Sequence, residues 1–113
     1  MTDTTTEFFN QLEARGHQPA LEKATGTLRF DLTDGKRKTR WLVAIERGDV
    51  AVSHRNAKAD CVARADKRVF DAIVGGERNA VAAMLRGELS VEGDRELMVL
   101  FQRLFPGPPR RGS

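Results

Sequence analysis

The sequence predicts an α+β domain in which a five-stranded, mostly antiparallel sheet is covered by helices on one face. Two changes of hydrophobic period support this prediction. Apolar residues recur at helical spacing near the N-terminus, alternate from Gly26 onward, and return to helical spacing after Asp66. Turn signals at Asp34-Gly35 and Gly48-Asp49 join successive strands as hairpins. The expected order of elements is α-β-β-β-β-α-α-β-α.

The N-terminal segment predicts a helix over residues 5–15. Thr4 and Glu7 have the spacing of a capping box, in which the threonine hydroxyl covers a free amide and the glutamate reaches back. Phe8 and Leu12 follow four residues apart and share one helical face. The helix is therefore expected to present an apolar side to the core.

Four strands are expected after this helix. The first begins at residue 26, and the next three cover about residues 39–47, 50–53 and 59–65. The apolar residues that alternate with polar ones on the first two strands are Leu28, Phe30, Leu32, Trp41, Val43 and Ile45. Because Leu42 and Ala44 are apolar as well, the second strand is expected to be central and at least partly covered on both faces.

Three more helices and a fifth strand are expected in the second half of the chain. Asp66, Asn79 and Asp94 stand where side chains cap helix N-termini. The three helices are expected at about residues 67–74, 80–86 and 95–104, with the fifth strand around residues 89–91. The side chains expected to face inward are Val69, Phe70, Ile73, Val74, Val81, Met84, Leu85, Leu97, Leu100, Phe101 and Leu104.

Length and charge limit the classes of protein that the chain can represent. A chain of 113 residues suits one domain, expected over residues 1–105, with a flexible tail containing proline and arginine over residues 106–113. The 19 Lys and Arg exceed the 16 Asp and Glu by three, and Arg110 and Arg111 account for two of these. The near-neutral body makes nucleic acid an unexpected partner.

The location of the protein follows from other features of composition. One cysteine, Cys61, excludes an internal disulfide and suits a reducing cytoplasm. The polar, acidic N-terminus is unlike a signal peptide, and apolar runs are far shorter than the ~20 residues that cross a bilayer. We therefore expect a cytoplasmic protein.

Residues for catalysis or metal binding are sparse. Cys61, His17 and His54 do not form a recognisable nucleophile–base arrangement or a set of metal ligands at short spacing, so no catalytic residue, metal or cofactor is expected. Cys61 is expected to be a small buried thiol. The basic run at residues 36–40 is expected to be a charged hairpin tip that discourages edge pairing, with transient contact to a membrane surface as the alternative.

Several phrases of the sequence, in their order, are similar to a known family. They are residues 26–35, the Ala-Asp-Cys at residues 59–61, and the pattern M-x-x-G-x-L-x-V-x-G-D at residues 84–94, followed by a helix ending in Gln-Arg-Leu. Over about residues 7–105 the chain resembles the sterol carrier protein 2 (nonspecific lipid-transfer) domain family, in its single-domain bacterial type. The resemblance implies a noncatalytic domain that binds and transfers a fatty acid, acyl-CoA or sterol in an apolar tunnel between sheet and helices.

The residues alone allow two kinds of interior, because a packed core and a lipid-sized cavity need the same side chains. The expected lining of a tunnel is Phe30, Trp41, Val43, Ile45, Val52, Phe70, Ile73, Met84, Leu85, Leu97, Met98, Phe101 and Leu104. Met98 and Leu100 stand where the family tends to place a small residue and a lysine, and their bulk is expected to narrow or fill the tunnel. The alternative function is a protein-interaction or homodimerisation module with a filled core.

Overall fold

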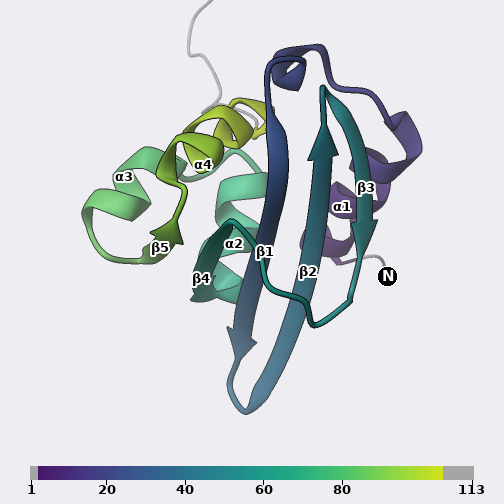
Figure 1. Cartoon of the computed structure of the whole chain (residues 1–113). Coiled ribbons are helices and arrows are strands. Elements are labelled where there is room, and N and C mark those ends of the chain that lie inside the picture. The colour runs from purple at the N-terminus through teal and green to yellow at the C-terminus, as the bar shows by residue number, and fades with distance from the viewer. Residues whose placement is uncertain (1–2, 106–113) are drawn as a thin grey trace, which may run out of the picture.

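The computed structural model describes residues 3–105, and the predicted tail at residues 106–113 lies outside them. Helices and strands follow in the predicted order, so the predicted fold class is confirmed (Figure 1). The elements are α1 (Thr4–Arg15), η1 (Pro19–Leu21), β1 (Thr25–Asp34), β2 (Arg37–Glu46), β3 (Asp49–Ser53), β4 (Cys61–Asp66), α2 (Lys67–Val74), α3 (Ala80–Leu85), β5 (Leu89–Gly93), α4 (Arg95–Phe101) and η2 (Gln102–Leu104). Among the described residues, no helix is both long and apolar enough to span a membrane.

The sheet has the strand order β3-β2-β1-β4-β5. The pairs β1–β2 and β2–β3 are antiparallel, as their hairpin signals predicted. The pair β4–β5, whose strands are separated in the chain by α2 and α3, is antiparallel as well. The pair β1–β4 is parallel, because the connection at residues 54–60 carries the chain from one side of the sheet, across β2 and β1, to the other (Figure 1). The sheet is therefore mixed, with its one parallel pair at the centre.

The two faces of the sheet differ in what covers them. The helices lie behind the strands in the view of Figure 1, against the face that carries Leu28, Phe30 and Leu32, which are all buried. The opposite face carries polar side chains of β1 such as Arg29 and Asp31. The connection at residues 54–60 crosses this second face, because Arg29 Nη1 donates a hydrogen bond to the carbonyl of Ala57.

The prediction that β2 is covered on both faces is confirmed at one position and wrong at the next. Leu42 is buried on the helix-free face, whereas Ala44, on the same face and nearer the end of the strand, is exposed. Leu42 is paired with Ser53 and lies beside Arg29 of β1, where the crossing connection is attached. Coverage of this face is therefore local to the crossing.

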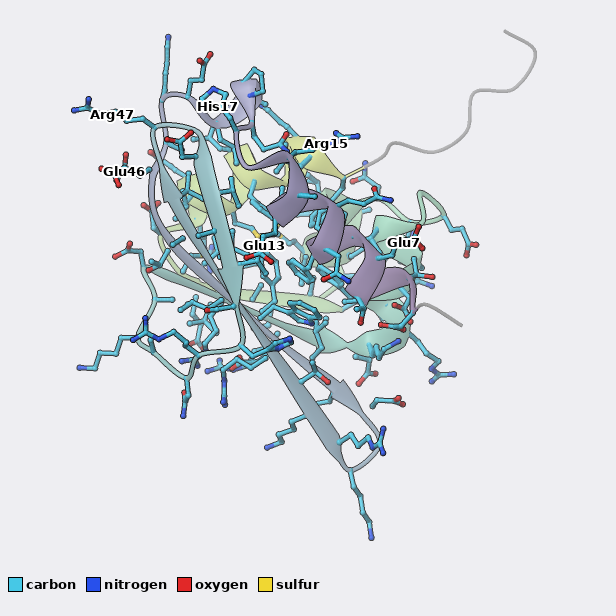
Figure 2. All side chains as sticks on the ribbon, turned by 90° about the vertical axis from the view of Figure 1, so that its right-hand side faces the viewer. Glu7, Glu13, Arg15, His17, Glu46 and Arg47 are labelled. Atoms are coloured by element: carbon cyan, nitrogen blue, oxygen red, sulfur yellow. The ribbon has the colours of Figure 1, made fainter. Side chains whose placement is uncertain are left out.

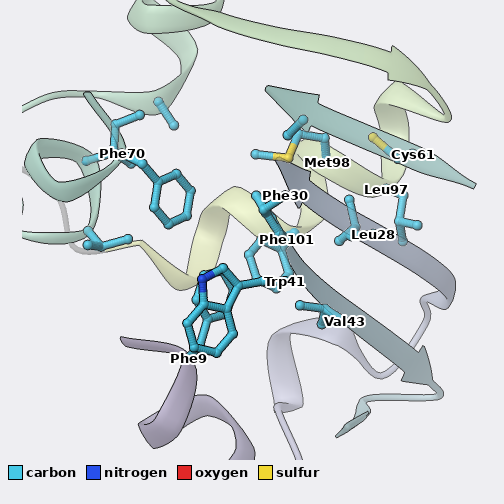
Figure 3. Packing of buried hydrophobic residues seen from close by; sticks show 14 of the residues in the cluster. Phe9, Leu28, Phe30, Trp41, Val43, Cys61, Phe70, Leu97, Met98 and Phe101 are labelled. Atoms are coloured by element: carbon cyan, nitrogen blue, oxygen red, sulfur yellow. The ribbon is translucent and has the colours of Figure 1, made fainter. Parts of the chain in front are cut away.

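One cluster of aromatic rings fills the space between the sheet and the helices (Figure 3). Phe9 of α1 stacks on Trp41 of β2, with ring centroids 4.5 Å apart, and on Phe70 of α2 at 5.7 Å. Phe30 of β1 contacts Phe70 and Phe101 of α4 at 5.4 and 5.3 Å. These rings join three helices to two central strands, and each aromatic pair adds about 0.5–1.5 kcal/mol to the effect of burial alone.

Helix α1 starts one residue before its predicted position, and its predicted capping box is wrong. The carboxylate of Asp3 accepts a hydrogen bond from the Thr6 amide at 3.1 Å and so caps the helix. Lys67 of α2 pairs with both Asp3 and Asp71, and the Thr5 hydroxyl also donates to Asp71. An aspartate caps a helix as well as a threonine does, and here it also fixes α1 to α2.

The prediction that Val81 and Leu85 face inward is wrong. Helix α3 packs against β5, and its buried residues are the alanines Ala80 and Ala83. Val81 and Leu85 are four residues apart and lie on the other side of this short helix, where they are 41% and 84% exposed. The small alanines allow a close approach to the strand, which rotates the larger side chains outward.

Gly93, the second glycine of the M-x-x-G-x-L-x-V-x-G-D pattern, ends β5, and its surroundings leave no room for a side chain. Gly93 has φ +93°, and a Cβ at this position would lie 2.2 Å from the carbonyl oxygen of Asp60. The amide of the next residue, Asp94, donates to that same carbonyl at 2.8 Å. The close approach fixes the start of α4 against the start of β4.

We predict that Gly93→Ala destabilises the fold more than Gly87→Ala does. Gly87 also has a positive φ, +77°, but a Cβ there would meet no atom within 4 Å. Backbone strain alone costs about 1–2 kcal/mol at Gly87, whereas strain and steric overlap together cost about 2–5 kcal/mol at Gly93. Urea unfolding of both variants measures this difference, and equal losses would contradict the role of the Asp60 contact.

Candidate ligand-binding groove

Most of the side chains expected to line a tunnel are packed together in the core. Nine of the thirteen are almost fully buried: Phe30, Trp41, Val43, Ile45, Phe70, Ile73, Leu97, Met98 and Phe101. Val52, Met84 and Leu104 are partly buried against them, and Leu85 points outward. The side chain of Met98, whose bulk was expected to narrow or fill a tunnel, lies in this core and has no exposed surface.

A hollow lies beside this core. It is a groove of about 530 Å³ between α1, the end of α2 and η2. We call it the α1 groove, and its lining residues are Thr4, Glu7, Phe8, Gln11, Leu12, Arg15, Gln18, Val74, Arg103 and Leu104. Leu104 is the one residue of the predicted lining that lies on it.

One face of α1 forms a whole side of the groove. Its lining positions, 4, 7, 8, 11, 12 and 15, follow the three- and four-residue spacing of a single helical face. With a rise of about 1.5 Å per residue, this face is about 16 Å long. Four of the ten lining residues are apolar and give the groove a hydrophobic strip; two of them, Phe8 and Leu12, lie in the middle of this helical face, and the others are Val74 and Leu104.

The charges of the groove are separated along α1. Arg15 lies in the last turn of the helix and Glu7 in the first, so they mark its two ends (Figure 2). Arg103 of η2 also lines the groove. Neither Arg15 nor Arg103 has an ion-pair partner among residues 3–105. The groove therefore combines an apolar strip with two guanidinium groups available to an anion.

Helical spacing placed Phe8 on the core face of α1 and gave no indication of the groove. The signal lay in the consecutive Phe8 and Phe9, because side chains that are neighbours in a helix point about 100° apart and cannot both face the centre of the core. Phe9 is fully buried, whereas Phe8 is half-buried and contacts Phe101 and Phe105 at 6.3 and 5.4 Å. The position of Arg103 could be known only from the path of the chain after α4.

A histidine fixes the end of the groove to the sheet. His17 Nδ1 lies 2.8 Å from the carboxylate of Asp49, and Nε2 lies 3.2 Å from that of Glu22. Hydrogen bonds to Asp49 and then to Glu22 raise the pKa of His17 above its usual value. Gln18, the next residue, lines the groove and donates its amide to the carbonyl of Gly48 at 2.7 Å. His17 and Gln18 thus link the end of α1 to the β2–β3 turn.

The two other residues considered for chemistry lie away from the groove. Cys61 is fully buried in β4, and burial, followed by the charges of Asp94 and Asp60, raises the pKa of its thiol to about 11. This thiol is protonated at neutral pH, in keeping with the expected buried hydrophobic role. His54 lies against the ring of Trp41, with ring centroids 4.1 Å apart. Within residues 3–105, no three potential metal ligands gather.

The fold and this groove define a small α+β domain with a concave amphipathic site, and comparison with known proteins gives its family. Residues 9–106 match the model of the SCP-2 sterol transfer family. The chain belongs to this family, and the resemblance seen in its sequence is confirmed. A search of curated proteins found no significant match.

Solved structures confirm the fold. The sterol carrier protein domain 2 of Helicoverpa armigera has a TM-score of 0.75 at 18% identity, over 95% of this chain and 91% of that one. Apo sterol carrier protein 2 from Yarrowia lipolytica also gives 0.75, at 19% identity, over 91% and 90%. Sterol carrier protein 2 from Aedes aegypti, in complex with palmitate, gives 0.71 at 21% identity, over 93% and 96%.

We predict that replacing His17 with Gln removes a pH-dependent part of the stability. Because the folded-state pKa of His17 is raised, its contribution is complete below the unfolded value of about 6.5 and is lost as pH rises through the folded value. The difference in Tm between the natural protein and His17→Gln should therefore be largest at about pH 5.5 and shrink toward pH 8. A difference that does not vary with pH would show that the carboxylates do not stabilise the charged ring.

Proposed function

We propose that the chain binds, and transfers without chemical change, an anionic single-chain lipid such as a fatty acid in the α1 groove. The observation that supports this most directly is the pairing of an apolar strip with two unpaired guanidinium groups in one hollow. Its volume of about 530 Å³ is within the usual range of small-ligand sites. The palmitate complex of the Aedes aegypti protein, which shares this fold, supports the same class of ligand.

The hydrocarbon chain is proposed to lie along α1. Phe8, Leu12, Val74 and Leu104 give it apolar surface, and each methylene removed from water contributes about 0.8 kcal/mol. A linear chain suits a groove that follows one helical face better than a rigid, wide ring system does. Sterols are therefore a less suitable ligand class than fatty acids for this groove.

The carboxylate is proposed to bind at the Arg15 end. Guanidinium groups form paired hydrogen bonds with carboxylates, and these bonds are stronger than those between neutral groups. Glu7, at the other end of α1, repels an anion and so favours one orientation of the lipid.

We predict that the double variant Arg15→Gln/Arg103→Gln weakens fatty-acid binding about tenfold, through loss of charge-assisted hydrogen bonds at an exposed site. Energy transfer from Trp41, the only tryptophan, to a dansyl-labelled fatty acid reports binding, and displacement by palmitate gives the affinity. Hexadecanol, which has no carboxylate, should bind both proteins equally.

The matched control is Arg86→Gln/Arg95→Gln, which removes the same charge from exposed positions outside the groove. This control should bind palmitate as the natural protein does. If the two double variants lose affinity equally, or if the natural protein takes up no fatty acid, the proposed site is wrong.

A dimerisation module with a filled core is the second candidate function. The packed aromatic cluster and the exposed Leu85 and Val81 on α3 are the observations that favour it. If α3 joins two copies, Leu85→Glu should convert a dimer to a monomer in light scattering, because it places a charge in an apolar contact. A monomeric natural protein would exclude this function.

A further inference from the structure

The face of the sheet opposite the helices carries a row of charged residues that neither the core nor the α1 groove uses. Asp31 of β1 is paired in register with Arg40 of β2 and with Arg64 of β4. Directly paired residues point to the same face of a sheet, so the two arginines flank the carboxylate from both sides. Arg29, two residues earlier on β1, lies on this face as well.

One arginine already satisfies the carboxylate of Asp31. Arg29 donates from Nε to Oδ1 at 3.0 Å and from Nη2 to Oδ2 at 3.1 Å, and its Nη1 binds the carbonyl of Ala57. Arg40 and Arg64 approach Asp31 less closely, with Nε at 3.4 and 3.9 Å. The two flanking arginines are therefore held near one another around a carboxylate that already accepts two hydrogen bonds from Arg29.

The other contacts of this row leave some of its positive charge without a partner. Arg64 also pairs with Glu92 at 3.1 Å, near the edge of the sheet. The Nε atom of Arg40 is buried and has no hydrogen-bond acceptor. Lys38, on the next row of β2, is exposed and has no ion-pair partner among the described residues. The Nε–H of Arg40 has an ion-pair contact with Asp31 but no hydrogen bond, and a buried N–H without an acceptor beside further cations favours an additional acceptor at this place.

The surface is hollowed where these cations meet. The hollow has a volume of about 190 Å³, and we call it the Asp31 hollow. Its lining residues are Asp31, Leu32, Thr33, Lys38, Thr39, Arg40 and Arg64, which carry three positive charges and one negative charge. Asp66 lies nearby but accepts a hydrogen bond from the Thr33 hydroxyl at 3.0 Å.

We propose that the Asp31 hollow binds a phosphate group, with Arg40, Arg64 and Lys38 as its ligands. Phosphate offers several acceptor oxygens and up to two negative charges, which suits two guanidinium forks and an ammonium group. Asp31, held by Arg29, acts as a positioning residue that keeps the flanking arginines on either side of the hollow. The group is supplied by a phospholipid headgroup or by a free phosphate compound, and both present the same chemistry.

The site is independent of the proposed fatty-acid site. The Asp31 hollow and the α1 groove lie on opposite faces of the sheet and share no lining residue. The Arg15→Gln/Arg103→Gln variant should therefore bind phosphate as the natural protein does. The failure of one of these two proposals therefore leaves the other unaffected.

The test variant is Arg40→Gln/Arg64→Gln, which leaves the Arg29–Asp31 pair in place, and Arg86→Gln/Arg95→Gln is the control of equal charge change. Lys38→Gln is a second variant, because its exposed, unpaired side chain can be replaced with little effect on Tm. Binding of inorganic phosphate and pyrophosphate is followed by NMR titration of backbone amides. Sedimentation with vesicles of phosphatidylcholine, with and without 30% phosphatidic acid, tests the lipid source.

We expect the natural protein and the control to bind alike, and Arg40→Gln/Arg64→Gln to lose at least tenfold in affinity, with a smaller loss for Lys38→Gln.

If the protein binds acidic vesicles but not free phosphate, a phospholipid headgroup is the source. If it binds free phosphate but not vesicles, a soluble compound is the source. The proposal is overturned if neither binds, or if the control loses as much as the test variant. A short oligonucleotide is titrated in the same way, and the proposal is overturned as well if the oligonucleotide is the one probe that binds.

Discussion

The aromatic cluster is the contact on which the rest of the structure depends. All six phenylalanines and the single tryptophan belong to it, and they come from every layer of the domain. Phe9 stacks between Trp41 and Phe70, which fixes α1 against both the sheet and α2. Because these rings occupy the space between sheet and helices, the concave site lies at the border of the cluster, where Phe8 is half-buried and lines the α1 groove.

The same sheet has two different surfaces because its side chains alternate. On β1, Leu28, Phe30 and Leu32 enter the core, while Arg29 and Asp31 lie on the opposite face. A single strand thus contributes to the packed interior on one side and to a charged hollow on the other. The two proposed binding sites are separated by the thickness of the sheet, so they bind chemically different groups without competing.

Membership of a lipid-carrier family does not by itself locate the ligand. The core of this chain is built from large side chains, among them Met98, which is fully buried. This chain shares its fold with solved structures whose sequences are only about 20% identical to it. The fold tolerates such divergence because packing needs only side chains of suitable size and polarity. The place and shape of a hollow depend on individual side chains, and these change more readily than the fold.

The sequence by itself determined the order of elements, the sheet turns and the apolar face of each long strand, because period and turn chemistry are local properties. It also determined the family, through short phrases that include Gly93, where no side chain fits. Tertiary structure decided the parallel central pair, the outward position of Leu85 and the pairing of Asp31 with two arginines. These features depend on how residues far apart in the chain pack against one another, and a local sequence pattern holds no information about such packing.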